Sequence, residues 1–283
     1  MMNKKGTSLR SIGLLYLLTG AAISNTALSF ETPTVISLSP AATELIYELK
    51  LENHLIAVDK NSNFPDQAKQ LPNIGDAFNP NLELLAHYNP DFVIHFSKSQ
   101  TLDAAQQSLK LTLVPMQPKN MEELFKQAEE LASRLQHSRT EQVNQWRQQW
   151  QTLNKHYQSN SVSKKIFIYL GFNPIYTLGK NAFLSQSLHS CGTQGLFDDQ
   201  NVASLMISKE QLLVSPPDKV LVGISIHESI PKRTQQIIDE FKALGITLTT
   251  NQIVFANQDI LFRPTIRFLD YLPTLCQQLQ REN

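Results

Sequence analysis

The segment Asn81–Val93, NLELLAHYNPDFV, has a second copy 127 residues later at Ser208–Val220, SKEQLLVSPPDKV. Both copies fit the pattern E-x-L-x4-P-D-x-V. Each begins with a polar residue that can cap a helix, reaches a proline that lacks the amide a helix needs, and then enters an apolar run typical of a strand. Each copy therefore predicts one short helix followed by one strand.

The distance between the copies bears on the number of domains. A spacing of 127 residues is too long for a solenoid repeat and is close to the length of one domain. The repeat therefore favours two related α/β lobes, and a chance similarity between two helix–strand units is the alternative.

Strands alternate with helices through the first lobe, which we place at residues 30–136. The expected strands are residues 34–38, 55–59, 91–96 and 111–116. The first strand is followed by Ser39, a helix cap, and by Pro40, which suits the first position of a helix. This alternation predicts a parallel sheet with helices on both faces and a ligand site beyond the carboxyl ends of its strands.

Residues 121–158 contain neither glycine nor proline, and their apolar positions have helical spacing. The sequence HSRT at residues 137–140 interrupts the pattern. One helix therefore ends the first lobe, and a second helix at residues 139–158, about 28 Å long, connects the lobes.

A second α/β lobe is expected at residues 161–283. Its predicted strands are residues 164–171, 176–179, 220–224 and 246–250, and its last helix spans residues 264–280. The predicted fold class is α/β, with two Rossmann-like lobes of mainly parallel sheet joined by a single long helix.

The N-terminus has the pattern of a secretory signal peptide, which we place at residues 1–29. Basic residues precede the apolar run SIGLLYLLTGAAIS, and small residues suited to cleavage precede Phe30. An anchor helix is the alternative, but it requires roughly 20 apolar residues, and Thr19, Gly20 and Ser24 interrupt this run. The protein is therefore expected in the periplasm, and its signal contains no cysteine for lipid attachment.

The net charge and the cysteine content limit which kinds of partner and metal site are expected. Cleavage removes three basic residues and no acidic one, which leaves 22 basic and 25 acidic residues, a net charge of −3. This balance argues against nucleic acid as a partner. Cys191 and Cys276 are the only cysteines, and an oxidising compartment favours a disulfide over a metal pair, because zinc requires further ligands nearby.

Motifs of common hydrolases are missing from the sequence. The chain has no G-x-S-x-G, no H-E-x-x-H and no glycine-rich phosphate loop, and its seven histidines are scattered. No enzymatic activity is therefore expected, and a secreted α/β hydrolase is a distant alternative. A zinc carrier is disfavoured, because the chain has no histidine-rich loop.

Six segments in order cover nearly the whole mature chain: VISLSPAATELIYELKL, LPNIGDAFNPNLELLAHYNPDFVI, FNPIYTLGKN, CGTQGLF, ISKEQLLVSPPDKVLV and DILFRPTIRFLDYLPTLC. Together they resemble the vitamin B12 (cobalamin)-binding branch of the class III periplasmic substrate-binding proteins of ABC importers. The resemblance implies two lobes bridged by a rigid helix with limited closure, and a disulfide between Cys191 and Cys276. It also implies a monomer without a cofactor, which captures a corrinoid as the transported ligand and delivers it to a permease.

The resemblance also assigns ligand contacts. The family's aromatic cleft positions fall on Phe96 and Tyr176. Its polar pair, which is directed at the amide rim of the ligand, falls on Asp259 and Arg263. The alternative for these two residues is a surface ion pair of little energetic value. A tyrosine and two tryptophans of the family are replaced here by Asn61, Ala77 and Ser204, with Phe64 and Phe78 close by. The predicted ligand-binding residues are Asn61, Phe64, Phe78, Phe96, Tyr176, Asp259 and Arg263.

These replacements leave the ligand open. Another corrinoid or another metal chelate, haem or a ferric siderophore, is the alternative to cobalamin. Haem ranks lower because Gly75 is not followed by the tyrosine that haem carriers use. No metal site is expected, and His95, beside Phe96, is a candidate metal contact for which a structural role is the alternative.

The same resemblance implies a function for the repeated segment. The glutamates with which the family docks onto arginines of the permease fall on Glu83 and Glu210, one in each lobe. Such charges guide docking more than they tighten it. The alternative is local, because a carboxylate at the second position of a helix interacts favourably with the helix dipole.

Overall fold

The computed structural model describes Met1, residues 32–158 and residues 163–282. Apart from Met1, the predicted signal peptide at residues 1–29 lies outside the described residues. All elements of secondary structure belong to the compact unit Thr32–Asn283. Among the residues that the structure describes, no helix combines the length and the apolar character needed to cross a membrane.

Four parallel strands form the sheet of the first lobe, in the order β2-β1-β3-β4. They are β1 (Val35–Leu38), β2 (Leu55–Val58), β3 (Phe92–His95) and β4 (Leu113–Pro115). The central strands β1 and β3 are buried along their whole length, as expected for a sheet covered on both faces. The four predicted strands and their parallel arrangement are confirmed.

The helices of this lobe fill the intervals between its strands. They are α1 (Pro40–Glu48), α2 (Leu82–Tyr88) and α3 (Gln100–Ser108), with the 3-10 turns η1 (Glu52–His54) and η2 (Asp66–Gln70). Helix α1 begins as predicted, because the Ser39 side chain accepts a hydrogen bond from the Ala42 amide and Pro40 occupies the first helical position.

The second lobe contains a parallel sheet of four strands in the order β11-β10-β5-β8. They are β5 (Lys164–Tyr169), β8 (Thr193–Gly195), β10 (Lys219–Ile224) and β11 (Ile253–Asn257). Its helices and 3-10 turns are α6 (Phe183–Leu188), η3 (His189–Cys191), α7 (Lys209–Val214), α8 (Ile230–Ala243), η4 (Thr250–Gln252) and α9 (Gln258–Leu261).

The strand predicted at residues 246–250 is wrong. Ile246 and Leu248 do point into the core, so the alternation that suggested a strand reflects real burial. The chain then passes through η4, and only from Ile253 onward does it pair with β10, Val220 facing Ile253. Pairing with a neighbour defines a strand, and local alternation does not reveal which segment obtains it.

A small antiparallel sheet accompanies the second lobe. Its strands are β6 (Gly171–Phe172), β7 (Ile175–Leu178) and β9 (Ser204–Ile207), in the order β6-β7-β9. The sequence predicted β7 and did not reveal its two antiparallel partners. The fold is therefore mainly, and not wholly, parallel, as predicted.

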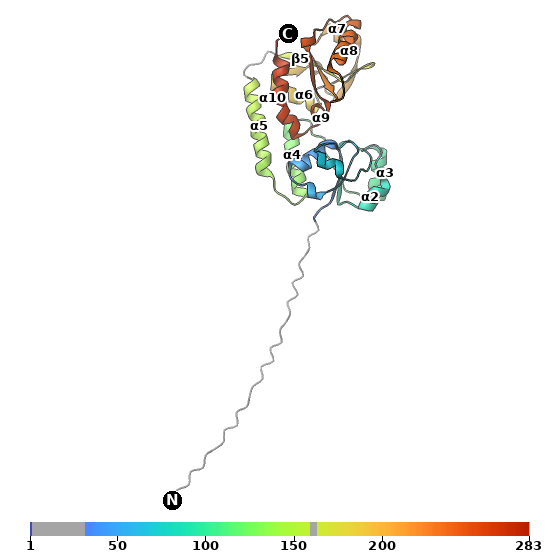
Figure 1. Cartoon of the computed structure of the whole chain (residues 1–283), viewed down its shortest axis with the longest axis vertical. Helices are drawn as coiled ribbons and strands as arrows, with labels where there is room; N and C mark the ends of the chain where they lie inside the picture. Colours follow the sequence, from blue (N-terminus) through green and yellow to red (C-terminus); the bar gives the residue numbers. More distant parts are fainter. Residues whose placement is uncertain (2–31, 159–162, 283) are drawn as a thin grey trace. The chain divides into compact units, whose positions relative to one another are not determined.

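Helix α5 (Thr140–Gln158) joins the two lobes along the chain, and two other long helices lie beside it, α4 (Met121–Arg134) and α10 (Ile266–Gln280). Helix α5, predicted at residues 139–158, packs against both α4 and α10 (Figure 1). A single buried cluster includes Val35 of the first sheet, Leu221 of the second and Leu272 of α10. The apolar core is therefore continuous between the lobes, which limits their relative motion.

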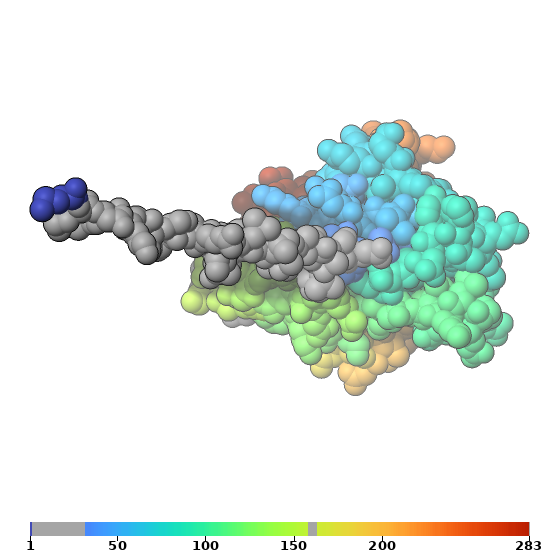
Figure 2. Space-filling view, turned by 90° about the horizontal axis from the view of Figure 1, so that it is seen from below, coloured from blue at the N-terminus to red at the C-terminus, as the bar shows by residue number. Residues whose placement is uncertain are grey.

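Helices α4 and α5 also contribute to the molecular surface. In Figure 2 their atoms, in green, border those of the first lobe, which run from blue to teal. The amphipathic pattern predicted for residues 121–158 agrees with this position, since Leu124 and Phe125 are fully buried while Lys126 is exposed.

The disulfide between Cys191 and Cys276 is confirmed. It joins η3 to α10, and both residues are fully buried. The second lobe is thereby fastened covalently to the last helix of the chain.

Both copies of the repeat adopt the predicted helix–strand unit. Asn81 caps α2 by accepting a hydrogen bond from the Leu84 amide, and Ser208 caps α7 in the same way through the Gln211 amide. Strands β3 and β10 follow and occupy central positions in their sheets. The two copies of the repeated sequence are therefore structurally equivalent.

Candidate ligand-binding cleft

A concave site lies where the carboxyl ends of β1, β2 and β3 meet the segment around Arg263. Its first part, which we call the apolar hollow, has a volume of about 660 Å³. Its apolar lining consists of Leu38, Pro40, Ala41, Ala77, Phe78, Phe96, Phe262 and Pro264. The position agrees with the ligand site predicted beyond the strand ends.

A second part, the polar hollow, has a volume of about 580 Å³. It takes residues from the ends of β2, β10 and β11 and from the start of α10. Among its lining residues are Lys60, Asn63, Phe64, Lys69, His227, Gln258, Asp259 and Arg267. Lys60, Asn61 and Arg263 line both hollows, so the two adjoin and together form one cleft.

Three phenylalanines leave large apolar surfaces uncovered in the apolar hollow. Phe78 is 63% exposed, Phe96 is 46% exposed and Phe262 is 40% exposed. Exposed aromatic faces gathered in a concave site are typical of a binding site for a flat apolar ligand, because they bury much area and lose little side-chain entropy.

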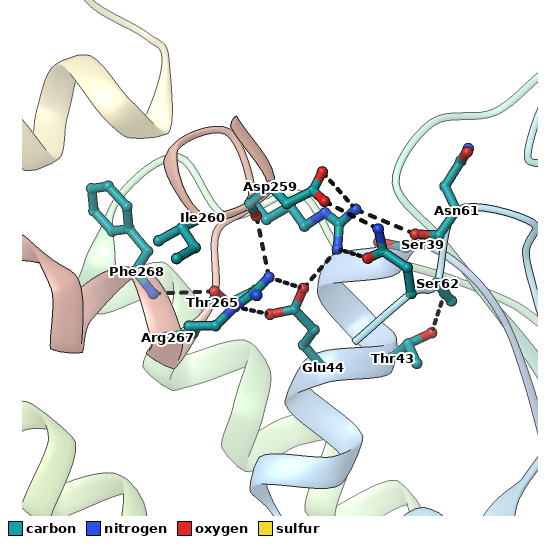
Figure 3. A network of polar contacts seen from close by, with 12 residues as sticks. Ser39, Thr43, Glu44, Asn61, Ser62, Asp259, Ile260, Thr265, Arg267 and Phe268 are labelled. Carbon is teal, nitrogen blue, oxygen red and sulfur yellow. Dashed lines mark hydrogen bonds and ion pairs between the residues drawn. The ribbon is translucent and has the colours of Figure 1, made fainter. Parts of the chain in front are cut away.

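A buried carboxylate, that of Glu44, holds two arginines that line the cleft (Figure 3). The side chain of Glu44 on α1 is 1% exposed, and its Oε1 accepts hydrogen bonds from Arg263 Nη1 at 2.9 Å and Arg267 Nη2 at 2.7 Å. Its Oε2 accepts from Arg267 Nε at 3.0 Å. One carboxylate of the first lobe therefore holds two arginines that belong to the C-terminal segment of the chain.

Arg263 has further partners on both sides of the cleft. Its Nη1 donates to Asn63 Oδ1 at 2.7 Å, and its Nη2 donates to the Asn61 carbonyl at 3.3 Å and to Asp259 Oδ1 at 3.0 Å. Asp259 Oδ2 in turn accepts from Asn63 Nδ2 at 3.0 Å. The Asp259–Arg263 pair predicted from the sequence exists, and its polar atoms contact protein groups.

Burial dominates the electrostatics of this region. It raises the pKa of Glu44, although both arginines act in the opposite direction. It also raises the pKa of Asp59, which lines the apolar hollow, against the effect of hydrogen bonds from the Ser62 hydroxyl and the Asn61 amide. Arg267 additionally lies 4.0 Å from the centre of the Phe64 ring, in a cation–π contact.

Six of the seven predicted ligand-binding residues are brought together. Asn61 and Arg263 line both hollows, Phe78 and Phe96 line the apolar hollow, and Phe64 and Asp259 line the polar hollow.

Tyr176 is the one predicted ligand-binding residue that does not line the hollows. It is located on β7, where it pairs with Met206 of β9, and it lines neither hollow. Of the other replaced aromatic positions, Ala77 lines the apolar hollow and Ser204 lies on β9.

His95 is the last residue of β3 and is buried. Its ring lines neither hollow. Burial lowers its pKa, so the ring is stabilised in its neutral form.

Several cleft residues were not identified from the sequence. Arg267 lies four residues after Arg263 and could have been found by that spacing. Glu44 stands within the apolar face of α1, where an acidic residue signals a buried partner. Phe262 and His227 carry no local signal, because only the fold brings their segments to the cleft.

The two predicted docking residues occupy equivalent places. Glu83 is the second residue of α2, and Glu210 is the second residue of α7. Within the described part of the chain, neither forms an ion pair with a basic residue. The pKa of Glu210 is lowered, chiefly by a hydrogen bond from its own backbone amide.

Comparison with known proteins identifies the family. The family model described as "Periplasmic binding protein" matches residues 35–247. The chain belongs to the periplasmic binding protein family. It is therefore a binding protein and not an enzyme, which removes the hydrolase alternative.

Individual relatives support this assignment. The vitamin B12-binding protein of Yersinia pestis (strain Pestoides F) is 26% identical over 250 residues, which cover 87% of this chain and 85% of that protein. The crystal structure of the periplasmic vitamin B12-binding protein BtuF of Vibrio cholerae is similar with a TM-score of 0.69 and 28% identity, covering 87% of this chain and 96% of that one.

The same fold occurs in a protein named for another ligand. The periplasmic haem-binding protein HutB of Vibrio cholerae has a TM-score of 0.72 and 19% identity, covering 88% of this chain and all of that one. Within the family, this periplasmic binding protein therefore shares its fold with carriers of different chelates.

Proposed function

We propose that this periplasmic binding protein captures a corrinoid of the vitamin B12 type in its cleft and delivers it to the permease of an ABC importer. The observation that carries the proposal is the apolar hollow, where Phe78, Phe96 and Phe262 present exposed faces to a space of about 660 Å³. The relatives named for vitamin B12, which cover 87% of the chain, support the same ligand class.

Binding requires apolar contact and little movement. A corrin macrocycle is broad and flat, so stacking it against the phenylalanines buries a large apolar area. Its amide rim suits the neighbouring polar hollow, where Gln258 and His227 offer hydrogen-bonding groups. The continuous core under both lobes favours a cleft that is largely formed before the ligand arrives.

Delivery depends on two further proposals. Residues 1–29 act as a cleaved signal that directs the protein to the periplasm, where it works as a monomer. Glu83 and Glu210 then meet basic residues of the permease, one from each lobe, and guide docking through charge.

Titration calorimetry with cyanocobalamin, cobinamide, haemin and a ferric siderophore tests the ligand. We expect saturable binding of cyanocobalamin and cobinamide, with no chemical change to either. Clear binding of haemin together with no binding of either corrinoid would contradict the corrinoid assignment and favour haem as the ligand.

Two aromatic variants locate the contact. Phe96→Ala should weaken corrinoid binding by about tenfold, because it removes one exposed face of the apolar hollow. Tyr176→Ala, at a similarly exposed aromatic residue outside both hollows, should have the smaller effect. Equal losses in the two variants would show that the ligand also reaches β7.

One observation favours a second candidate ligand, a haem or another iron chelate. His227 lines the polar hollow, and imidazole is a common axial ligand of iron. An absorption spectrum of bound haemin that changes in His227→Ala would support this candidate.

A further inference from the structure

Burying the carboxylate of Glu44 costs desolvation free energy, which favourable contacts must offset. An isolated charge at this depth is strongly unfavourable unless it is paired and hydrogen-bonded. Both oxygens are used, since Oε1 contacts Arg263 and Arg267 and Oε2 contacts Arg267. Helix α1 thereby anchors two guanidinium groups from the α9–α10 segment, which is 219 residues away in the sequence at Arg263.

The anchored Arg263 contacts the wall of the cleft. It donates to the Asn61 carbonyl and to Asn63 Oδ1, and Asn63 also donates to Asp259. Figure 3 shows these contacts continuing from Glu44 toward Asn61. The chain of bonds therefore runs from a buried charge to an exposed loop.

That loop separates the two hollows. Asn61 and Arg263 line both of them, whereas Asn63 lines only the polar hollow. Four N–H···O contacts of Arg263 are directed at protein atoms, so its guanidinium is held within the wall. The position of residues 61–63 consequently depends on where Arg263 is held.

We propose that Glu44 is a positioning residue of the cleft, which fixes Arg263 and, through it, the segment Asn61–Asn63 that divides the apolar hollow from the polar hollow. The Asp259–Arg263 pair then shapes the site by bonding across the cleft. The effect on ligand affinity rests on the proposed function, whereas the positioning itself does not.

The substitution Glu44→Gln isolates the charge. Gln has nearly the shape of Glu, but it presents an NH₂ donor where two guanidinium groups also donate. Arg263 should therefore lose its fixed place. Glu52→Gln, at an exposed side chain just after α1, is the matched control.

Hydrogen exchange tests the positioning without a ligand. In the folded protein the Asn61 amide donates to Asp59 Oδ2 and the Ser62 amide to the Asp59 carbonyl, so both are measurable. We expect exchange of residues 61–63 to rise about tenfold in Glu44→Gln and to stay unchanged in Glu52→Gln. Ile46→Val, a core change on the same helix, controls for lower stability alone. Unchanged exchange in Glu44→Gln would overturn the inference.

A double-mutant cycle tests the link to binding. With cyanocobalamin as the probe, Glu44→Gln and Asn63→Ala should each weaken affinity by about tenfold, and the double variant should be no weaker than the worse single one. Additive losses would mean that the two residues act separately and would overturn the inference.

The remaining outcomes separate the two proposals. If the wild type binds cyanocobalamin and Glu44→Gln binds it equally well, the positioning role fails and the proposed function stands. If the wild type binds neither corrinoid, the proposed function fails and hydrogen exchange still decides the positioning. Should Glu44→Gln not fold, Asn63→Ala, at an exposed position, breaks the same chain of bonds and takes its place in the exchange measurement.

Discussion

The two lobes use one helix–strand unit in different surroundings. In the first, Asp91 accepts hydrogen bonds from the Thr34 amide at 2.7 Å and the Thr34 hydroxyl at 2.9 Å. In the second, Asp218 accepts from the Lys165 amide at 2.7 Å. Each aspartate also donates its own amide back to the same residue, so both lobes lock a central strand to its neighbour by the same reciprocal bonds.

The positions after the aspartates differ. Phe92 in the first lobe corresponds to Lys219 in the second, and both are buried. Lys219 donates to the Asn251 carbonyl at 2.8 Å, and burial lowers its pKa. The comparison teaches that the backbone bonds of the unit are fixed, while a buried side chain can change its chemistry where the new lobe supplies a partner.

The cleft shows the same division between the lobes. The first lobe supplies most of the apolar hollow, including Phe78 and Phe96. The second lobe contributes polar groups such as His227 and Asp259. A shared frame therefore supports unequal halves of one binding site.

The largest difference between the lobes is covalent, since only the second lobe has a disulfide. Replacing both Cys191 and Cys276 by alanine should lower the free energy of unfolding by about 4 kcal/mol, because the bond closes a loop with a sequence separation of 85 residues. Denaturant unfolding at equilibrium measures the loss. A reducing agent should reproduce it in the wild type and leave the variant unchanged.

The second difference lies at equivalent positions of β3 and β10, His95 and Val222. Burial lowers the pKa of His95, so the unfolded chain takes up the proton first and stability falls as the pH drops below about 6.5. His95→Val should remove this part of the acid sensitivity, so the variant should lose less stability than the wild type as the pH falls below about 6.5.

Thermal unfolding of both proteins between pH 8 and pH 5 measures the difference. His87→Ala is the control for a histidine at an exposed position, and it should keep most of the acid sensitivity. Parallel pH curves for wild type and His95→Val would contradict the assignment.

The aspartates test whether the two units are energetically equal. Asp91→Ala should cost about 1 to 2 kcal/mol, and Asp218→Ala slightly less, because Asp91 accepts from a hydroxyl as well as an amide. Chemical denaturation of the two single variants measures the order. A reversed order would show that surroundings outweigh the counted hydrogen bonds.

The smallest stability effect is expected at Glu83 and Glu210. Replacing both by alanine should change the free energy of unfolding only slightly, because solvent screens the interaction of an exposed carboxylate with the helix dipole. Ligand affinity should not change, and binding to permease-containing vesicles should weaken most at low ionic strength. Unaltered vesicle binding would leave only the local helix role, and Glu141→Ala, in the first turn of α5, is the matched control.

Much of the fold followed from local signals in the sequence. Caps at Ser39, Asn81 and Ser208 fixed helix starts, because each side chain bonds an amide within three residues. The strand predicted at residues 246–250 was wrong because it depended on a signal that is not local. The alternation of apolar residues shows which side chains are buried, but it does not show which segment pairs with β10.

The site was only partly predictable. Phe96 was found because the resemblance placed an aromatic contact there, and Phe78 because it follows Ala77, which replaces an aromatic residue of the family. Phe262 and His227 were not, since their segments reach the cleft from distant parts of the chain, and Arg267 was missed although its spacing from Arg263 indicated it.

The sequence by itself determined the two helix–strand units, their order and the ends of most helices, because capping, proline geometry and hydrophobic period act over a few residues. Only the tertiary structure decided that Glu44 meets Arg263 and Arg267, that Asn63 meets Asp259, and that two hollows share one wall. The physical reason is that a buried charge is stable only beside its counter-charge, and the continuous core between the lobes determines which residues become neighbours.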